Sequence, residues 1–283
     1  MDPGRKLQRK VSLIIHDPVV EEGRGRRLSQ VFGWHDPDRL VGEFIRDLGV
    51  CSHGRVDYEV TERIHVNAFP RKRDGFIYSA RAYLDHWRMG RGFHHPDEAD
   101  YHHLATEFEM VPKVNAGSVD EFWLMGFPYA GYYESRMAGP RAFWCNAPPL
   151  TGTAKSARRF VIMGFNYERG VGEMLESYGH RAESIMAAVY NGIRGAANLW
   201  ERFTRYDLTH PGRAEVGNVH FAPNSGRDYD WGNRRYVDSN CDDWMNFPDF
   251  QGVVRSVNCQ EWGNGDMRAH HLWWFRHFPH VSG

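Results

Sequence analysis

The sequence predicts an α/β fold with a mainly parallel, Rossmann-like sheet and helices, followed by a loop-rich, aromatic C-terminal half. The chain of 283 residues is 41% hydrophobic and 14% aromatic, which excludes disorder and is enough for the core of one large domain. We expect a single domain over 1–283, with an α/β core at 1–210 and a loop-rich capping region at 211–283 packed on it. Three segments predict the central parallel strands, because each is apolar on both faces: 11–15, 119–127 and 160–166.

A helix is expected after the first strand, over residues 36–48. Asp36 can cap its first turn, and Pro37 fits the first helical position because its missing N–H would have no partner there. Gly49 is expected to end this helix. The elements that follow in the first half are a strand at 56–66, a turn at Asp74-Gly75 before an extended segment at 76–78, a short helix at 80–87, and an irregular, His-rich region at 88–113.

Two of the predicted central strands share a sequence pattern. Trp123-Leu124-Met125-Gly126-Phe127-Pro128-Tyr129 parallels Val161-Ile162-Met163-Gly164-Phe165-Asn166-Tyr167, and glutamates follow each segment. Ligands of parallel sheets bind beyond the carboxyl ends of the strands. We therefore expect Glu134, Glu176 and His180 to share one solvent-accessible cleft, although the repeated pattern is equally explained by two similar core environments.

The helix expected after the strand at 160–166 carries an acidic face with one imidazole. At about 100° per residue, its polar side chains fall within roughly 80° of arc, while apolar side chains occupy the opposite side. Such a face can hold a divalent metal or provide acid and base groups. It is equally typical of a solvated surface with local salt bridges to Arg181. The polar side chains are Glu173, Glu176, His180 and Glu183.

The segment Glu176-Ser177-Tyr178-Gly179-His180 resembles the metal-binding helix of zinc metallopeptidases, whose pattern is His-Glu-x-x-His. Glu176 stands at the first histidine, and Ser177 replaces the general-base glutamate. The resemblance therefore implies a two-ligand clamp that takes a third ligand from elsewhere. Candidates for that ligand are Glu173 and Glu183, one turn away, and His220 or Asp230 in the downstream loops.

These features predict a hydrolase that uses zinc or another divalent metal on a polymeric or oligomeric peptide or glycan. Metal ligands are expected among Glu176, His180, Glu183 and His220. The predicted catalytic residues are Glu134, Glu173 and Glu176, and the predicted substrate-binding residues are Tyr129, Tyr133, Asn166, Tyr167, Asp230 and Trp231.

Two other functions are compatible with the same residues. Glu134 and Glu176 could act without metal as the carboxylate pair of a glycoside hydrolase. Alternatively, the aromatic second half could be a non-enzymatic carbohydrate-binding surface. A nucleotide cofactor is not expected, because the glycine-rich stretch 164–172 lacks both the GxGxxG and the GK[ST] patterns.

Charge and hydropathy disfavour nucleic acid and membranes as partners. The formal net charge is −1, and no apolar run reaches the roughly 20 residues of a membrane span. The residues around 126–149 look similar to uncharacterised bacterial proteins of secreted type, which implies export. Residues 1–6 lack the apolar core of a signal peptide, so a cytoplasmic location is the alternative. The best disulfide candidates are Cys241 and Cys259, with buried free thiols as the alternative for these and for Cys51 and Cys145.

Overall fold

The computed structural model describes residues 6–279, which fall into two compact units. The described residues of unit 1 are 6–7, 44–57 and 171–279, and unit 2 comprises 8–43 and 58–170. This division does not coincide with the predicted boundary at residue 210. The single domain with a capping region therefore stays a prediction. Residues 1–5, which belong to the segment behind the cytoplasmic alternative, lie outside the described residues, as does His280.

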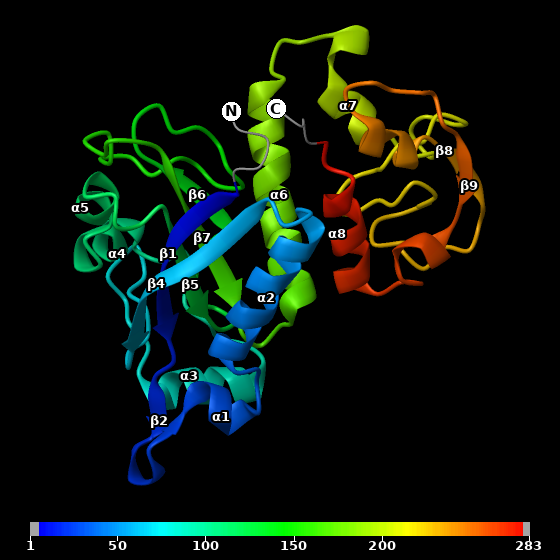
Figure 1. The fold of residues 1–283 in the computed structure, drawn as a ribbon. Helices are drawn as coiled ribbons and strands as arrows, with labels where there is room; N and C mark the ends of the chain where they lie inside the picture. The colour runs from blue at the N-terminus through cyan, green and yellow to red at the C-terminus, as the bar shows by residue number, and fades with distance from the viewer. Residues whose placement is uncertain (1–5, 280–283) are drawn as a thin grey trace. The chain divides into compact units, whose positions relative to one another are not determined.

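A five-stranded sheet forms the framework of unit 2, with the strand order β4-β1-β5-β7-β6 (Figure 1). The central strands β1, β5 and β7 run parallel, and β6 is antiparallel to β7. The fold is therefore mixed α/β with a mostly parallel sheet, and the three predicted central strands are confirmed; the Rossmann-like label stays a prediction. The strands are β1 (Leu7–His16), β4 (Val56–Val66), β5 (Glu121–Gly126), β6 (Ser135–Ala138) and β7 (Phe160–Asn166).

The repeated strand pattern has a packing explanation. A Cβ at Gly126 would lie 2.7 Å from the Tyr132 ring, and a Cβ at Gly164 would lie 2.3 Å from the carbonyl oxygen of Tyr133. Both glycines thus leave room for the segment that runs over the ends of β5 and β7. The pattern therefore reports two similar core environments.

The helices of the first half follow the expected signals only in part. Helix α2 (Pro37–Cys51) begins as predicted, because the Asp36 carboxylate accepts a hydrogen bond of 2.8 Å from the Arg39 N–H. It continues two residues beyond Gly49. The helix predicted at 80–87 is α3 (Ala80–Met89), whereas the segment 76–78 is not a strand.

The prediction of an irregular region at 88–113 is wrong for its second half. Helices α4 (Tyr101–Glu107) and α5 (Met110–Asn115) lie there, and Asp100 caps the first of them. Each helix is too short to show a clear period. Both are held instead by packing of Leu104, Met110 and Val114 into the main core of unit 2. The remaining elements of unit 2 are β2 (Val19–Glu21), η1 (Glu22–Arg24), β3 (Arg26–Arg27) and α1 (Leu28–Phe32).

Unit 1 is centred on helix α6 (Val171–Val189), which lies beside α8 (Met267–Arg276) (Figure 1). The sequence did not predict α8, because its histidines and tryptophans break the polar face of an amphipathic pattern. Two short helices follow α6, namely η2 (Gly195–Ala197) and α7 (Leu199–Phe203). Short elements complete the unit: β8 (Val237–Ser239), η3 (Cys241–Asn246), β9 (Arg255–Val257) and η4 (Cys259–Trp262).

The aromatic residues of unit 1 form its core. Trp244, Trp262 and Trp274 are at most 2% exposed, so they provide packing and no stacking surface. All four cysteines are buried free thiols, and Cys241 is not joined to Cys259. Within residues 6–279, no helix combines the length and the apolar character that crossing a membrane requires.

Candidate metal centre

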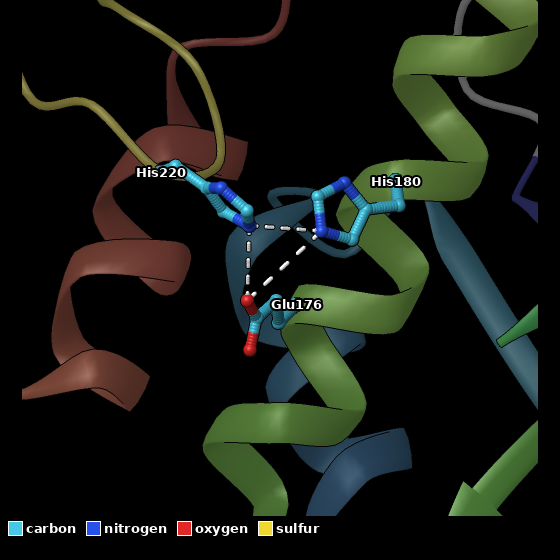
Figure 2. A group of neighbouring side chains, drawn as sticks. All are labelled: Glu176, His180 and His220. Carbon is cyan, nitrogen blue, oxygen red and sulfur yellow. Dashed lines mark hydrogen bonds and ion pairs between the residues drawn. The ribbon is translucent and has the colours of Figure 1, made fainter. Parts of the chain in front are cut away.

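Three side chains of unit 1 converge on one point and are called here the Glu176 cluster: Glu176, His180 and His220. The first two lie one turn apart on α6, and the third comes from the loop after α7 (Figure 2). The two Nε2 atoms of the histidines are 3.0 Å apart. Oε1 of Glu176 is 3.1 Å from the Nε2 of His220 and 3.9 Å from that of His180. Three potential ligand atoms therefore face the same small volume.

A glycine allows the loop to reach the helix. A Cβ at Gly179 would lie 2.6 Å from Cγ2 of Val219, so any larger residue would push the loop away. The Asn218 side chain then fixes the turn by accepting hydrogen bonds of 3.0 Å from the N–H groups of His220 and Phe221. The indole of Trp274 donates to the carbonyl of Gly217 at 3.0 Å. The position of His220 is therefore set by packing and by hydrogen bonds on both sides.

Each imidazole is oriented by a carboxylate behind it. Nδ1 of His180 lies 3.0 Å from Oε2 of Glu183, and Nδ1 of His220 lies 3.0 Å from Oδ1 of Asp228. Carboxylates only accept hydrogen bonds, so Nδ1 of His180 carries the hydrogen of its hydrogen bond to Glu183. In a neutral His180 the Nε2 atom then presents a lone pair toward the Nε2 of His220 and toward Glu176. A positive charge between these three atoms would satisfy their lone pairs.

The distances fit a small ion. Ligands at about 2.0–2.1 Å from a tetrahedral zinc ion are separated by roughly 3.3–3.4 Å. The three separations of 3.0, 3.1 and 3.9 Å lie around that value. The site also communicates with solvent, since the side chains of His180 and His220 are 21% and 27% exposed.

The local electrostatics also favour a positive charge. Burial alone would raise the pKa of Glu176, but hydrogen bonds from His220 and Tyr229 outweigh burial and lower this pKa. The pKa of His220 is raised, because its hydrogen bond to Glu176 stabilises the imidazolium against the opposing effect of burial. This point of the structure thus stabilises positive charge on the His220 imidazole.

Glu183 contacts His180 at Nδ1 and is not a member of the Glu176 cluster, and its role as a metal ligand stays a prediction. Its Oε2 holds His180, and its Oε1 accepts a hydrogen bond of 3.2 Å from the N–H of Val219. Glu183 therefore joins α6 to the loop that carries His220. Glu173, on the first turn of α6, is partly buried and is not a member of the Glu176 cluster.

The other predicted site residues are distributed over both units. In unit 1, Asp230 is 2.9 Å from the N–H of Gly226, and Trp231 is only 4% exposed. In unit 2, Glu134 is hydrogen-bonded by Asn146. The shared cleft of Glu134 with Glu176 stays a prediction. The other predicted site residues of unit 2 are Tyr129, which is 40% exposed, the partly buried Tyr133 and Asn166, and the buried Tyr167.

The carboxyl ends of the strands in unit 2 do gather polar groups. Tyr132 lies 2.8 Å from Nδ1 of His16, and the hydroxyl of Tyr167 lies 3.3 Å from Oδ1 of Asp17. Asp17 also accepts hydrogen bonds from the N–H and the hydroxyl of Ser29, at 3.0 and 2.6 Å. Burial lowers the pKa of His16 to about 4, so this histidine is neutral near pH 7. The network is a hydrogen-bonded part of the core.

Sequence reasoning missed two residues that contact the Glu176 cluster, Asp228 and Tyr229. The hydroxyl of Tyr229 is 3.0 Å from Oε1 of Glu176 and 3.1 Å from Nε2 of His220. The run Asp228-Tyr229-Asp230 was visible as a polar loop, but nothing in it showed which residue would turn toward α6.

A second group of potential ligands, called here the Cys241 cluster, consists of Cys241, Asp242 and His277. Its ligand atoms lie within 4.8 Å of one another, as those of the Glu176 cluster do. Arg255 already pairs with Asp242, at 2.7 and 3.2 Å. Burial raises the pKa of the Cys241 thiol to about 12, which disfavours the thiolate that a metal needs.

Comparison with known proteins gives no relative to set beside this geometry: no family model, no curated protein and no solved structure matches the chain.

Proposed function

We propose that the protein is a metal-dependent hydrolase, in which Glu176, His180 and His220 hold a divalent ion. The observation that carries this proposal is the arrangement of the two imidazoles. The Nδ1 of each lies 3.0 Å from a carboxylate oxygen, and their Nε2 atoms face each other at 3.0 Å beside the carboxylate of Glu176. A divalent ion at the centre would satisfy all three lone pairs at once.

The type of ligands favours zinc and a catalytic role. Two histidines and one carboxylate form a donor set found in catalytic zinc sites, which have three protein ligands and one exchangeable position. Neutral imidazoles and one carboxylate would leave a divalent ion with net charge +1 to polarise a bound water. Such an ion lowers the pKa of its water from 15.7 toward about 7, so no serine or cysteine nucleophile is needed.

We further propose that the substrate is a peptide or glycan whose bond reaches the ion from solvent. The partial exposure of both histidines supports an open site, as does the 49% exposure of Tyr229 beside them. The carboxylates of Glu183 and Asp228 would hold the imidazoles in place and increase their basicity toward the ion.

The test is hydrolysis of a protein substrate and a panel of polysaccharides by the purified protein, combined with elemental analysis. We expect one equivalent of zinc or another divalent ion, loss of activity on chelation, and recovery when zinc is added. The variant His180→Ala should lose both metal and activity. His103→Ala is the matched control, because His103 is also a helical histidine with a carboxylate one turn away, Glu107 at 3.4 Å.

The competing functions give different results. Activity that persists in chelator but is lost in both Glu134→Gln and Glu176→Gln would replace the metal mechanism by the carboxylate pair of a glycoside hydrolase. If no substrate is cleaved but a glycan is retained by the protein, the carbohydrate-binding alternative holds.

A further inference from the structure

Tyr229 lies where a fourth ligand of the ion would lie. Its hydroxyl oxygen is 3.0 Å from Oε1 of Glu176 and 3.1 Å from Nε2 of His220. These separations match those among the three ligand atoms themselves and approach the roughly 3.3–3.4 Å edge of a tetrahedral zinc site. The phenol oxygen therefore lies within coordination spacing of two of the three potential ligand atoms.

The backbone at Tyr229 is held in a conformation that bulky residues rarely adopt. Its φ is +56°, in the left-handed region, where a side chain with a Cβ is strained. The N–H of Tyr229 donates to the carbonyl of His220 at 3.2 Å, and Asp230 closes the loop by accepting from the N–H of Gly226 at 2.9 Å. Strain of this kind persists only where the surrounding structure enforces it, and it is common at functional sites.

A bound ion would change the hydrogen bonds that the hydroxyl can make to the Glu176 cluster. The lone pairs of Glu176 Oε1 and His220 Nε2 are then committed to the ion, so neither can accept the phenol hydrogen. The oxygen remains close to both atoms, at 3.0 and 3.1 Å, and can turn a lone pair toward the ion. These distances allow coordination of the ion in place of a hydrogen bond to the ligands.

We propose that the Tyr229 oxygen is the fourth ligand of the resting metal centre and is displaced when water or substrate binds. This inference rests on the proposed metal site. When the oxygen–metal bond forms, the phenol O–H bond breaks and the proton passes to solvent. When water displaces the oxygen, the phenolate takes a proton from that water, which leaves hydroxide on the ion as the nucleophile. Tyr229 would thereby supply the base that Ser177 cannot.

Three ligands come from firmly held positions, whereas Tyr229 comes from an exposed one. Its ring is 49% exposed and contacts the His220 ring at a centroid distance of 4.4 Å. It also contacts the buried Trp231, at 5.2 Å between ring centroids. A ring with one open side can swing away from the ion without disturbing the core, as a displaceable ligand must.

The test uses Cu²⁺ as a probe, because a tyrosine oxygen bound to Cu²⁺ gives a charge-transfer band in visible light. The full chain is freed of metal by chelation and titrated with Cu²⁺. We expect the wild type to bind one equivalent and to show the band. Tyr229→Phe should bind one equivalent without the band, and the control Tyr236→Phe, at an exposed tyrosine of the same unit, should keep it.

The possible failures can be told apart. If the wild type binds one equivalent of Cu²⁺ without the band, or if Tyr229→Phe retains the band, Tyr229 is not a ligand although the metal site stands. If the wild type binds neither Cu²⁺ nor Zn²⁺, the proposed function and this inference both fail. The circular dichroism spectrum of Tyr229→Phe should match that of the wild type, and Tyr229→Leu, which also lacks the oxygen, provides a second variant for the same measurement.

Discussion

The Glu176 cluster and the Cys241 cluster contain similar residues, and both place three potential ligand atoms within 4.8 Å of one another. They differ in what supplies the positive charge. In the Cys241 cluster, Arg255 forms two hydrogen bonds to Asp242, at 2.7 and 3.2 Å, and this guanidinium is part of the fold. In the Glu176 cluster, the carboxylate is contacted by His220 and Tyr229, which can both turn a lone pair toward an added ion.

The comparison shows that proximity of ligand atoms does not by itself indicate a metal site. The orientation of the histidines matters more. His277 donates its Nδ1–H to the carbonyl of Trp273 at 2.8 Å, an ordinary contact within one helix end, whereas Nδ1 of His180 and Nδ1 of His220 each lie 3.0 Å from a carboxylate oxygen. Carboxylates behind two converging imidazoles are the arrangement that holds metal ligands in position.

The largest expected effect separates the two clusters directly. Replacement of Glu176, His180 or His220 by Ala should weaken zinc binding by at least about 100-fold, because each removes one of the proposed ligands. Cys241→Ala should leave the affinity unchanged, since Arg255 already provides the charge beside Asp242. Competition against a zinc-sensitive dye measures the zinc affinity of the variants in both clusters. Equal losses in the two clusters would contradict the distinction.

The second effect concerns the carboxylates behind the imidazoles. Asp228→Ala and Glu183→Ala should each weaken zinc binding by about 10- to 100-fold, because the imidazoles lose their orientation and part of their basicity. The same titration with Asp238→Ala, an exposed carboxylate of β8, provides the control. Wild-type affinity in both test variants would show that the carboxylates do not act on the site.

The third effect comes from packing. Gly179→Ala places a methyl group 2.6 Å from Cγ2 of Val219 in the starting geometry, so the loop carrying His220 must shift. We expect a loss of about 1–3 kcal/mol in the free energy of unfolding and weaker zinc binding. Gly49→Ala in α2 is the matched control, because no atom lies within 4 Å of its Cβ. That variant should be stabilised by about 0.5–1 kcal/mol.

The smallest expected effect concerns the Arg255 guanidinium, which supplies the positive charge beside Asp242 in the Cys241 cluster. Hydrogen bonds from His277 and Arg255 lower the pKa of Asp242 below its usual value of 3.8. The stability gained from ionised Asp242 is therefore present above pH 3.8 and is lost as the pH falls through the lower pKa of the folded state. Arg255→Met should raise that pKa.

Urea unfolding at a series of pH values measures this difference. The variant should be less stable than the wild type by no more than about 1 kcal/mol at pH 7, because the ion pair is partly exposed. The difference in the free energy of unfolding between wild type and variant should become smaller as the pH is lowered below 3.8. A difference that is constant with pH would show that Arg255 does not act through Asp242.

Sequence alone predicted the elements that depend on local pattern. Runs that are apolar on both faces identified β1, β5 and β7, and the capping signal at Asp36 located the start of α2. The spacing of Glu176 and His180 placed both on one face of a helix, since residues four apart lie one turn apart. Short helices such as α4 and α5 gave no usable period, because tertiary packing stabilises them.

The sequence by itself therefore determined a mostly parallel α/β sheet and a helix with two potential ligands on one face. Only the tertiary structure decided that His220, out of 16 histidines, reaches that face, and that Asp228 and Tyr229 accompany it. The physical reason is that these two kinds of information depend on interactions over different distances along the chain. Helix and strand periods act between near neighbours in the chain, whereas the approach of a loop 40 residues away depends on packing, here on the missing side chain of Gly179 against Val219.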